Sequence, residues 1–327
     1  MDSYEGSRVL VTGGVGFIGS HLARRLVDLG SNVSLLDSMN PNYGGNLHNI
    51  SEIVERVSLH VEDMRNRVKL REILPGHTHI FNLAGQTSHA DSMRDPRTDL
   101  EINTAAQVDF LESCREVAPE ARIIFASTRQ LYGKPEYLPV DEDHPVRPVD
   151  VNGISKWAGE SYHRLYADVY GLQTGILRLT NTYGPHMRIK DARQTFLGIW
   201  IRKVLEGETF QVFGDGKQLR DFNHVDDVVE ILLEMGGAPE LDGSVFNLGS
   251  SEVVTLADVA HLLEILVPGA SHEIVPFPPE RATIDIGDYY GNYERVRDRF
   301  GWEPRVSLEQ GLEGTLDFYR ERIAWYL

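Results

Sequence analysis

Short runs rich in valine, isoleucine and leucine alternate with helix-like patterns over the first half of the chain. These runs predict six strands, at residues 8–12, 32–37, 56–61, 79–83, 121–127 and 173–179. Between the strands, apolar residues at helical spacing predict helices at 17–29, 98–117 and 151–170. Strands that are apolar on both faces are typical of a parallel sheet covered by helices on both sides. The pattern therefore predicts an α/β fold with a Rossmann-type, doubly wound parallel sheet.

The alternation breaks after residue 180. Residues 183–185 form a predicted turn, and the elements beyond it are shorter and irregular until a helical pattern at 225–234. We therefore expect residues 1–180, with about 223–250, to form the Rossmann domain. Residues 181–222 and 251–327 are expected to form a smaller C-terminal lobe that covers the carboxyl edge of the sheet.

Composition narrows the classes of function. Hydrophobic residues make up 41% of the 327 residues and charged residues 25%, which is ordinary for a globular protein. The formal net charge of −17 repels a phosphate backbone, so we expect no nucleic-acid partner. The single cysteine, Cys114, can form neither an internal disulfide nor a thiolate cluster, and we expect no metal. The first residues lack the pattern of a signal peptide and no run of 18 apolar residues occurs, so we expect a cytoplasmic protein without a membrane span.

A glycine-rich turn joins the first predicted strand to the first helix. Its spacing is Gly13-x-x-Gly16-x-x-Gly19, a relative of the G-x-G-x-x-G loop. Glycine at the first two positions allows a tight turn and close approach of a pyrophosphate, which the N–H groups of the following helix can bind. Gly19 would let that helix lie close to the strand. The turn predicts a dinucleotide site.

An acidic residue at the end of the second strand indicates which dinucleotide. Asp37 follows the glycine turn by about 20 residues, where a carboxylate can accept hydrogen bonds from both hydroxyls of the adenosine ribose. No lysine or arginine lies between Arg25 and Arg56, so nothing near it suits a 2′-phosphate. We therefore expect NAD rather than NADP. Asp63 and Met64 follow the third strand and are placed to touch the adenine, although an ordinary loop aspartate is the alternative for Asp63.

Further motifs follow in order along the chain. They are Asn82-Leu83-Ala84-Gly85-Gln86, Ser127-Thr128 with Leu131-Tyr132-Gly133, Gly153-Ile154-Ser155-Lys156, Leu177-Arg178-x-x-Asn181-x-Tyr183-Gly184-Pro185, Arg220-Asp221-Phe222 with Val225-Asp226-Asp227, and Gly301-Trp302-Glu303-Pro304. Together with the glycine turn, they make nearly the whole chain resemble the extended short-chain dehydrogenase/reductases. These are the NAD-dependent nucleotide-sugar epimerases and dehydratases.

The resemblance implies a role for each motif residue. The implied cofactor site consists of Gly13, Gly16, Phe17, Ile18, Asp37, Ser38, Asp63, Met64, Leu83, Ala84, Gly85, Gln86 and Lys156. Lys156 would bind the nicotinamide ribose and lend positive charge to the site of hydride transfer. Thr128 would bind the sugar hydroxyl that is oxidised. The diphosphate of a nucleotide-diphosphate sugar would be held by Asn181, Arg220 and Arg281.

The position of the family's general base is different in this chain. The family has a tyrosine four residues before the lysine, and here that residue is Asn152. An amide can orient a hydroxyl, but it cannot take a proton near neutral pH. The expected catalytic set is therefore Thr128, Asn152 and Lys156, with the base supplied by another group. The candidates are Tyr132, Tyr183, His89 and His186, each of which has an ordinary packing or loop role as its alternative.

A second departure narrows the reaction. The family's 4,6-dehydratases carry an Asp-Glu pair directly after the threonine, whereas this chain reads Thr128-Arg129-Gln130. Neither side chain can act as a carboxylate acid or base, so 4,6-dehydration is disfavoured. The leading hypothesis is an NAD-dependent nucleotide-sugar epimerase, most simply at C4 through a transient ketosugar. The alternatives are a non-catalytic protein that binds NAD and a nucleotide sugar, and a nucleotide-ketosugar reductase or dehydrogenase.

The two longest predicted helices, 98–117 and 151–170, carry more apolar residues than one buried face needs. These are Leu100, Ile102, Val108, Leu111, Trp157, Leu165 and Val169. Members of the family that the chain resembles commonly pair these helices across a two-fold axis into a four-helix bundle. We therefore expect a homodimer.

Overall fold

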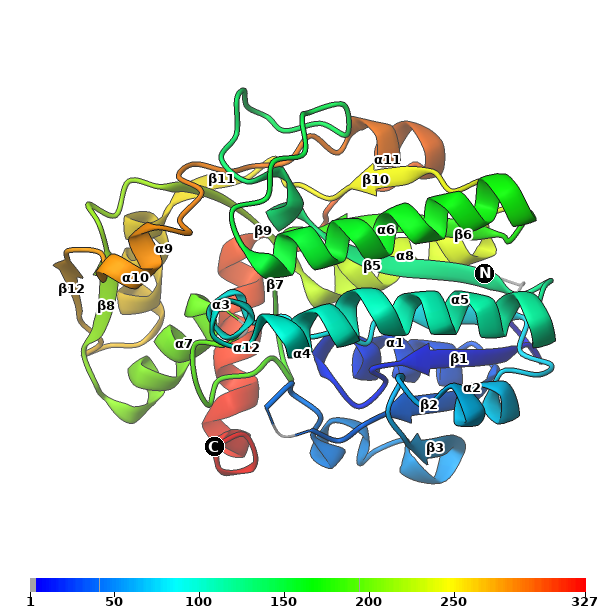
Figure 1. Cartoon of the computed structure of the whole chain (residues 1–327). Helices are drawn as coiled ribbons and strands as arrows, with labels where there is room; N and C mark the ends of the chain where they lie inside the picture. Colours follow the sequence, from blue (N-terminus) through cyan, green and yellow to red (C-terminus); the bar gives the residue numbers. More distant parts are fainter. Residues whose placement is uncertain (1–3, 41, 194) are drawn as a thin grey trace.

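The computed structural model describes residues 4–40, 42–193 and 195–327. Seven strands form the main sheet, in the order β10-β6-β5-β4-β1-β2-β3, and every neighbouring pair is parallel (Figure 1). They are β1 (Arg8–Thr12), β2 (Asn32–Asp37), β3 (Val57–Val61), β4 (His79–Asn82), β5 (Arg122–Thr128), β6 (Thr174–Leu179) and β10 (Val245–Asn247). The six strands predicted from the sequence are all present within one residue at each end. The doubly wound α/β fold is confirmed.

Helices cover both faces of the main sheet, as its apolar strands require. The helices α1 (Phe17–Asp28) and α8 (Val225–Gly237) lie behind it in Figure 1, and α2 (Arg67–Ile73), α5 (Ala106–Val117) and α6 (Val151–Tyr170) lie in front. Along β1, Val9 and Val11 pack into the core cluster that includes residues of α1 and α8, whereas Leu10 packs into the cluster on the α5 side. Alternate residues of one strand thus support two cores, which explains the unbroken aliphatic run.

The helix expected at 98–117 is interrupted. It consists of α4 (Pro96–Leu100), a π-helical turn η3 (Glu101–Ala105) and α5. Within η3, the buried side chain of Asn103 donates hydrogen bonds to the carbonyl oxygen of Gln86 at 2.9 Å and to Asp99 Oδ2 at 3.1 Å. The first of these contacts joins the π-helical turn to the loop after β4. Such turns are frequently found at functional sites. A hydrophobic pattern does not reveal such an interruption.

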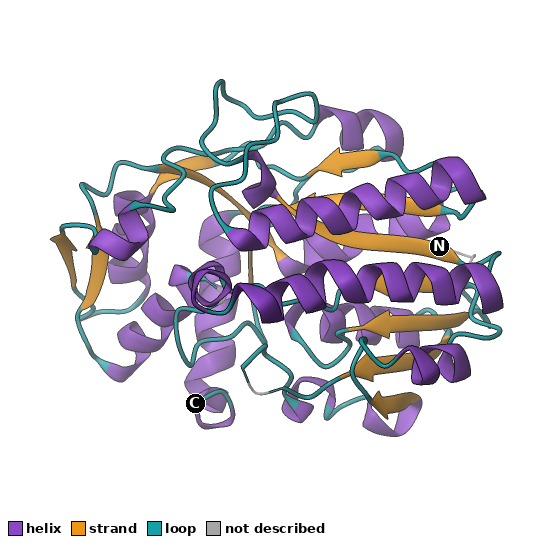
Figure 2. Ribbon diagram, in the orientation of Figure 1, coloured by secondary structure: helices purple, strands orange, loops and turns teal. Residues whose placement is uncertain are grey.

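Two smaller sheets lie beyond the carboxyl ends of the main strands, on the left of Figures 1 and 2. One contains β11 (Val253–Thr255), β9 (Leu219–His224) and β7 (Asn181–Tyr183), and the other contains β12 (His272–Val275) and β8 (Phe210–Phe213). The helices that accompany them are α7 (Phe196–Glu206), α9 (Leu256–Leu266), α10 (Pro279–Ala282), α11 (Glu294–Phe300) and α12 (Leu308–Arg322). None of these five helices was predicted from the sequence. The division of the chain into two domains stays a prediction.

Short helices complete the structure. They are η1 (Leu47–Ile50), η2 (Val54–Arg56), α3 (His89–Arg94), η4 (Arg129–Tyr132) and η5 (Ile323–Trp325). Among the described residues, no helix combines the length and the apolar character that crossing a bilayer requires.

Candidate active site

A cavity of about 650 Å³ lies at the carboxyl ends of the main strands, where they face the smaller sheets. All the residues expected to bind the cofactor, to bind the diphosphate or to form the catalytic set line this cavity. These residues are Gly13, Gly16, Phe17, Ile18, Asp37, Ser38, Asp63, Met64, Leu83, Ala84, Gly85, Gln86, Thr128, Asn152, Lys156, Asn181, Arg220 and Arg281. The fold therefore brings all of them into one site.

The glycine turn forms a backbone cradle at one end of the cavity. Gly13 has a φ of 68°, and a Cβ there would lie 3.0 Å from the backbone nitrogen of Ala84. Gly16 is the N-cap of α1 and has no side chain to cap the first N–H groups of the helix, which therefore remain available to an anion. The expected role of Gly19 needs correction. A Cβ at Gly19 would lie 2.2 Å from the carbonyl oxygen of Gly13, so this glycine permits contact with the turn rather than with the strand.

Asp37 is held by the backbone on two sides. Its Oδ2 accepts a hydrogen bond from Val15 N at 3.0 Å, and its Oδ1 accepts one from Met39 N at 2.9 Å. Burial raises the pKa of this carboxyl, although the two N–H donors act in the opposite direction. Each oxygen keeps a further lone pair for a ribose hydroxyl. The cradle and this carboxylate suit the pyrophosphate and the adenosine ribose of NAD.

One basic residue near this end of the cavity was not predicted. Arg65 lines the cavity, but its guanidinium contacts Asp63 at 2.7 Å and Glu101 at 3.4 Å. The hydrogen bonds from Arg65 hold the pKa of Asp63 below its usual range. Arg65 is therefore already paired with two carboxylates, and its presence does not favour a 2′-phosphate.

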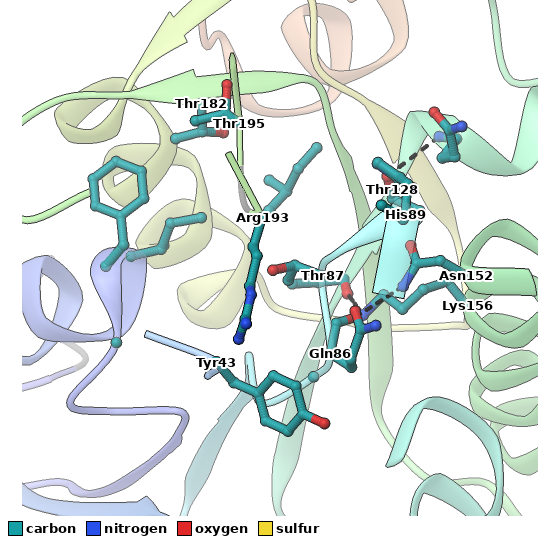
Figure 3. Close-up of a pocket in the computed structure, with 18 of the residues that line it drawn as sticks. Tyr43, Gln86, Thr87, His89, Thr128, Asn152, Lys156, Thr182, Arg193 and Thr195 are labelled. Carbon is teal, nitrogen blue, oxygen red and sulfur yellow. Dashed lines mark hydrogen bonds between the residues drawn. The ribbon is translucent and has the colours of Figure 1, made fainter. Parts of the chain in front are cut away.

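Lys156 and Thr128 lie on one wall of the cavity (Figure 3). Lys156 is buried, its Nζ donates to the carbonyl oxygen of Ala126 at 2.5 Å, and it lies 4.4 Å from the centre of the Phe125 ring. Burial lowers the pKa of Lys156 to about 8. Thr128 Oγ1 accepts from Gln130 N at 3.2 Å, which leaves the hydroxyl hydrogen to donate elsewhere.

Asn152 lies one helical turn before Lys156 and is buried. Its Nδ2 donates to the carbonyl oxygen of Gln86 at 2.8 Å (Figure 3). It also donates to Asp99 Oδ2 at 3.1 Å. A carbonyl and a carboxylate can only accept, so the orientation of the amide follows from its partners. Asn152 therefore offers the cavity its Oδ1, which can accept a hydrogen bond from a ligand.

The structure separates the four candidates for the missing base. Tyr132 OH donates to Asn247 Oδ1 at 2.7 Å, and burial raises its pKa to about 12. Tyr183 is buried, with its hydroxyl 3.3 Å from the carbonyl oxygen of Ser307. Tyr183 and His186 were both candidates for the base, but the fold places them away from the cavity. Neither they nor Tyr132 are among the described residues that line the cavity.

His186 lies away from the cavity because other residues hold its ring. Its ring hydrogen-bonds with Asn49 at 3.1 Å and Tyr326 at 2.7 Å, both outside the cavity lining. Burial lowers the pKa of His186 to about 2, so the ring stays neutral. Of the four candidates, His89 alone lines the cavity, and its Nδ1 lies 3.0 Å from the carboxylate of Asp150.

A further group of lining residues supplies amide and guanidinium groups. Asn181 Nδ2 donates to the carbonyl oxygen of Asp221 at 2.9 Å, and its Oδ1 accepts from Arg129 Nη2 at 3.0 Å. Arg220 Nη1 donates to the carbonyl oxygen of Leu219 at 2.8 Å, and burial lowers the pKa of Arg220 to about 10. The Arg281 guanidinium lies 5.1 Å from the centre of the Phe213 ring. These side chains can bind an anionic group.

Several lining residues belong to no motif and were missed. They are Asn40, Tyr43, Arg65, Arg193, Thr195, Trp200, Lys203, Phe213 and Phe277. Most lie on loops whose course depends on tertiary contacts. Trp200 and Lys203 could have been found, because both lie on α7, where the apolar residues of 196–206 have a helical period.

Comparisons with known proteins agree with this geometry. The family model described as "NAD dependent epimerase/dehydratase family" matches residues 9–249. A UDP-glucose 4-epimerase of Mycolicibacterium smegmatis is 33% identical over 317 residues, which cover 96% of this chain and 99% of that protein. The crystal structure of UDP-glucose 4-epimerase from Thermotoga maritima with UDP-glucose has a TM-score of 0.88 at 31% identity, and the match covers 97% of this chain and 99% of that one.

A further solved structure is UDP-glucose 4-epimerase of Thermus thermophilus in complex with NAD. It has a TM-score of 0.84 at 30% identity, and the match covers 96% of this chain and 99% of that chain. These matches span the main sheet and the elements beyond it. The chain belongs to the NAD dependent epimerase/dehydratase family.

Proposed function

We propose that this protein is an NAD-dependent nucleotide-sugar epimerase that inverts the sugar at C4. The observation that carries the proposal is that one cavity joins a dinucleotide cradle, a threonine–lysine wall and a set of anion-binding side chains. The similarity to UDP-glucose 4-epimerases supports a UDP-sugar as the substrate class.

The cofactor would be held by the glycine turn and by Asp37. When bound, NAD would supply a hydride acceptor beside the sugar. Lys156 would bind the nicotinamide ribose, and its ammonium would stabilise the negative charge that develops on the sugar oxygen. Because burial lowers the pKa of Lys156 to about 8, this lysine is mostly charged at neutral pH.

The sugar would lie against the wall that carries Thr128 and Asn152. The Thr128 hydroxyl and Asn152 Oδ1 would orient the sugar hydroxyl that is oxidised, one as donor and the other as acceptor. Asn181, Arg220 and Arg281 would bind the diphosphate. For epimerisation, the ketosugar ring has to rotate so that it can be reduced on its other face. The diphosphate must therefore stay bound while the sugar ring remains free to move.

The side chains that follow Thr128 argue against 4,6-dehydration. Arg129 is bound to Asn181 and stacks 4.8 Å from the Tyr289 ring centre. Gln130 Nε2 donates to Asp150 Oδ2 at 2.8 Å. Both positions therefore hold neutral or cationic groups engaged with the protein, and neither can move protons during loss of water.

The test is incubation of the purified protein with a panel of nucleotide sugars. Epimerisation leaves the mass unchanged, so the product is separated from the substrate by chromatography and identified by NMR. The absorbance of the bound cofactor reports any reduced NAD. We expect a C4 epimer without net redox change. Net accumulation of reduced or oxidised cofactor would instead identify a reductase or dehydrogenase, and tight binding without any change in sugar or cofactor would identify a binding protein.

A further inference from the structure

We propose that His89, positioned by Asp150, is the general base that takes the proton of the sugar hydroxyl in this protein. The inference rests on the proposed function and goes beyond it, because it names the group that does the work of the missing tyrosine. It is carried by His89, which lies on the wall of the cavity that also holds Thr128, Asn152 and Lys156 (Figure 3), and by the buried carboxylate of Asp150 beside it.

The two members of the pair differ in exposure. The Asp150 side chain is fully buried, whereas the His89 side chain is 36% exposed and lines the cavity. His89 Nδ1 lies 3.0 Å from the Asp150 carboxylate. Nδ1 has no aligned hydrogen-bond partner among the described residues, so the contact is one of distance and charge. The other ring nitrogen, Nε2, is the one left for a ligand. A carboxylate beside Nδ1 favours the tautomer with hydrogen on Nδ1, and in that tautomer Nε2 is a free acceptor.

Two donors hold Asp150 in place. Its Oδ1 accepts from Gly153 N at 2.7 Å as the N-cap of α6, and its Oδ2 accepts from Gln130 Nε2 at 2.8 Å. Burial raises the pKa of Asp150, but the nearby His89 and the donors Gly153 and Gln130 outweigh burial and hold the pKa below its usual value. Asp150 is therefore an ionised, immobile acceptor, which is what a positioning residue requires.

The same contacts tie His89 to the reacting wall. Gln130 lies two residues after Thr128, and its backbone N–H donates to Thr128 Oγ1 at 3.2 Å. On the other side, Asn152 N donates to Ser92 Oγ, one turn along α3 from His89, at 3.2 Å. The base, the hydroxyl donor and the amide acceptor are thus joined through Asp150, Gln130 and Ser92.

The proton and electron balance of the step is simple. The O–H bond of the sugar hydroxyl would break and its proton would pass to His89 Nε2. The adjacent C–H bond would break and a C=O bond would form, with bound NAD⁺, the oxidant of the proposed function, supplying the hydride acceptor. In the second half the hydride would return to the other face of the carbon, and His89 would return the proton to the oxygen.

Two substitutions test the pair, with a matched control. His89→Gln keeps a donor for Asp150 but cannot take a proton, and Asp150→Asn keeps an N-cap for α6 but cannot favour the Nδ1–H tautomer. The control is His261→Gln, because His261 is an exposed histidine that also faces a carboxylate, Glu264 at 3.5 Å, outside the cavity lining. We expect kcat to fall about 10²–10⁴-fold in His89→Gln. Nucleotide-sugar affinity by calorimetry should stay within about threefold, and the control should match the wild type.

A second readout does not depend on activity. Long-range ¹H–¹⁵N correlations of the imidazole show which ring nitrogen carries hydrogen. In the wild type we expect Nε2 of His89 to lack hydrogen when the ring is neutral, and in Asp150→Asn we expect hydrogen on Nε2. A histidine with a purely structural role would not change tautomer in step with kcat.

The outcomes separate the two proposals. If the wild type epimerises a sugar and His89→Gln keeps its kcat within about threefold, His89 is not the base and the proposed function stands. Hydrogen on Nε2 in the wild type also overturns the assignment, and this holds even if His89→Gln fails to fold. If the wild type binds nucleotide sugars without turning over any of them, the proposed function and the base fail together.

Discussion

Asn152 Nδ2 donates a hydrogen bond to the buried carboxylate of Asp99 at 3.1 Å. The same nitrogen donates to the carbonyl oxygen of Gln86, in the loop that follows β4. Asp99 Oδ2 also accepts from Asn103, whereas Asp99 Oδ1 has no hydrogen-bond partner among the described residues. A buried carboxylate with so few donors is sensitive to the loss of any one. Asn152 therefore has two roles. Its Nδ2 stabilises the buried Asp99 carboxylate and the loop after β4, and its Oδ1 is offered to a ligand.

The first prediction concerns this support. Asn152→Ala should lower the free energy of unfolding by about 1–3 kcal/mol, because Asp99 and Gln86 each lose a donor. In an Asp99→Asn background the same change should cost less, since the carboxylate is gone. A double-mutant cycle from thermal or chemical unfolding measures the difference. Equal costs in the two backgrounds would show that the Asn152–Asp99 contact does not contribute to stability.

The second prediction concerns Asn152→Tyr. A tyrosine would restore the phenol of the family pattern, but it would remove both donated hydrogen bonds at a buried position. We expect this variant to lose activity and stability rather than to gain oxidation of a bound sugar. The measurement is the absorbance of reduced nicotinamide after nucleotide sugar is added to the loaded protein. Faster oxidation than in the wild type would mean that the chain had merely lost its base.

The third prediction concerns the cofactor. Asp37→Ala removes a charged acceptor of two ribose hydrogen bonds and should weaken NAD binding by about 1.5–3 kcal/mol, which is about a 10- to 150-fold rise in Kd. Gly16→Val should be more damaging, because its side chain would occupy space at the start of α1 where the pyrophosphate is expected. Calorimetry with NAD and NADP measures both effects. Equal or tighter binding of NADP by the wild type would contradict the assignment of NAD.

The fourth prediction concerns the homodimer. Ile154, Trp157, Leu165 and Val169 form an exposed apolar stripe at helical spacing along α6. Leu111 of α5, which we expected to contribute to the dimer interface, is instead buried in the core cluster that includes Leu70 of α2. We expect a dimer at micromolar concentration and a monomer in the double variant Trp157→Glu with Leu165→Glu. Ile265→Glu, at an exposed apolar position on α9, is the control that should stay dimeric. A monomeric wild type in sedimentation would overturn this prediction.

Six of the seven main strands were predictable because they are rich in valine, isoleucine and leucine, most clearly β1, which is buried on both faces. The seventh, β10, was missed because it has only three residues. The caps of α6 are also local: Asp150 begins the helix and Gly171, in the left-handed region at a φ of 71°, ends it. The π-helical turn at Glu101–Ala105 was not predictable in this way. It depends on Asn103 reaching the loop after β4, a contact that no local pattern encodes.

The candidate site was predictable as far as motifs extend. The residues expected to bind the cofactor and the diphosphate, together with the expected catalytic set, all line the cavity. The motif tyrosines Tyr132 and Tyr183 do not, which shows that a motif places a residue near the site without showing where its side chain lies. The partners of these residues could not be predicted, since they come from distant segments. His89 and Asp150 meet only because α3 packs against the start of α6, and Tyr183 is buried because α12 lies over it.

The last prediction uses the buried lysine. Burial lowers the pKa of Lys156 from 10.5 to about 8, so between these two values the unfolded chain binds more protons at this site than the folded protein does. Stability contributed by this group is therefore flat below about pH 8 and rises as the pH increases towards 10.5, by about 3 kcal/mol in total. The cofactor-free wild type should gain this much relative to Lys156→Met over that range, as measured by chemical unfolding at a series of pH values. Lys217→Met, which removes an exposed lysine, controls for the general effect of losing a lysine. A constant difference between the wild type and Lys156→Met would show that the ammonium is not desolvated in the fold, and its positive charge would then have to be stabilised by contacts other than Ala126 and Phe125.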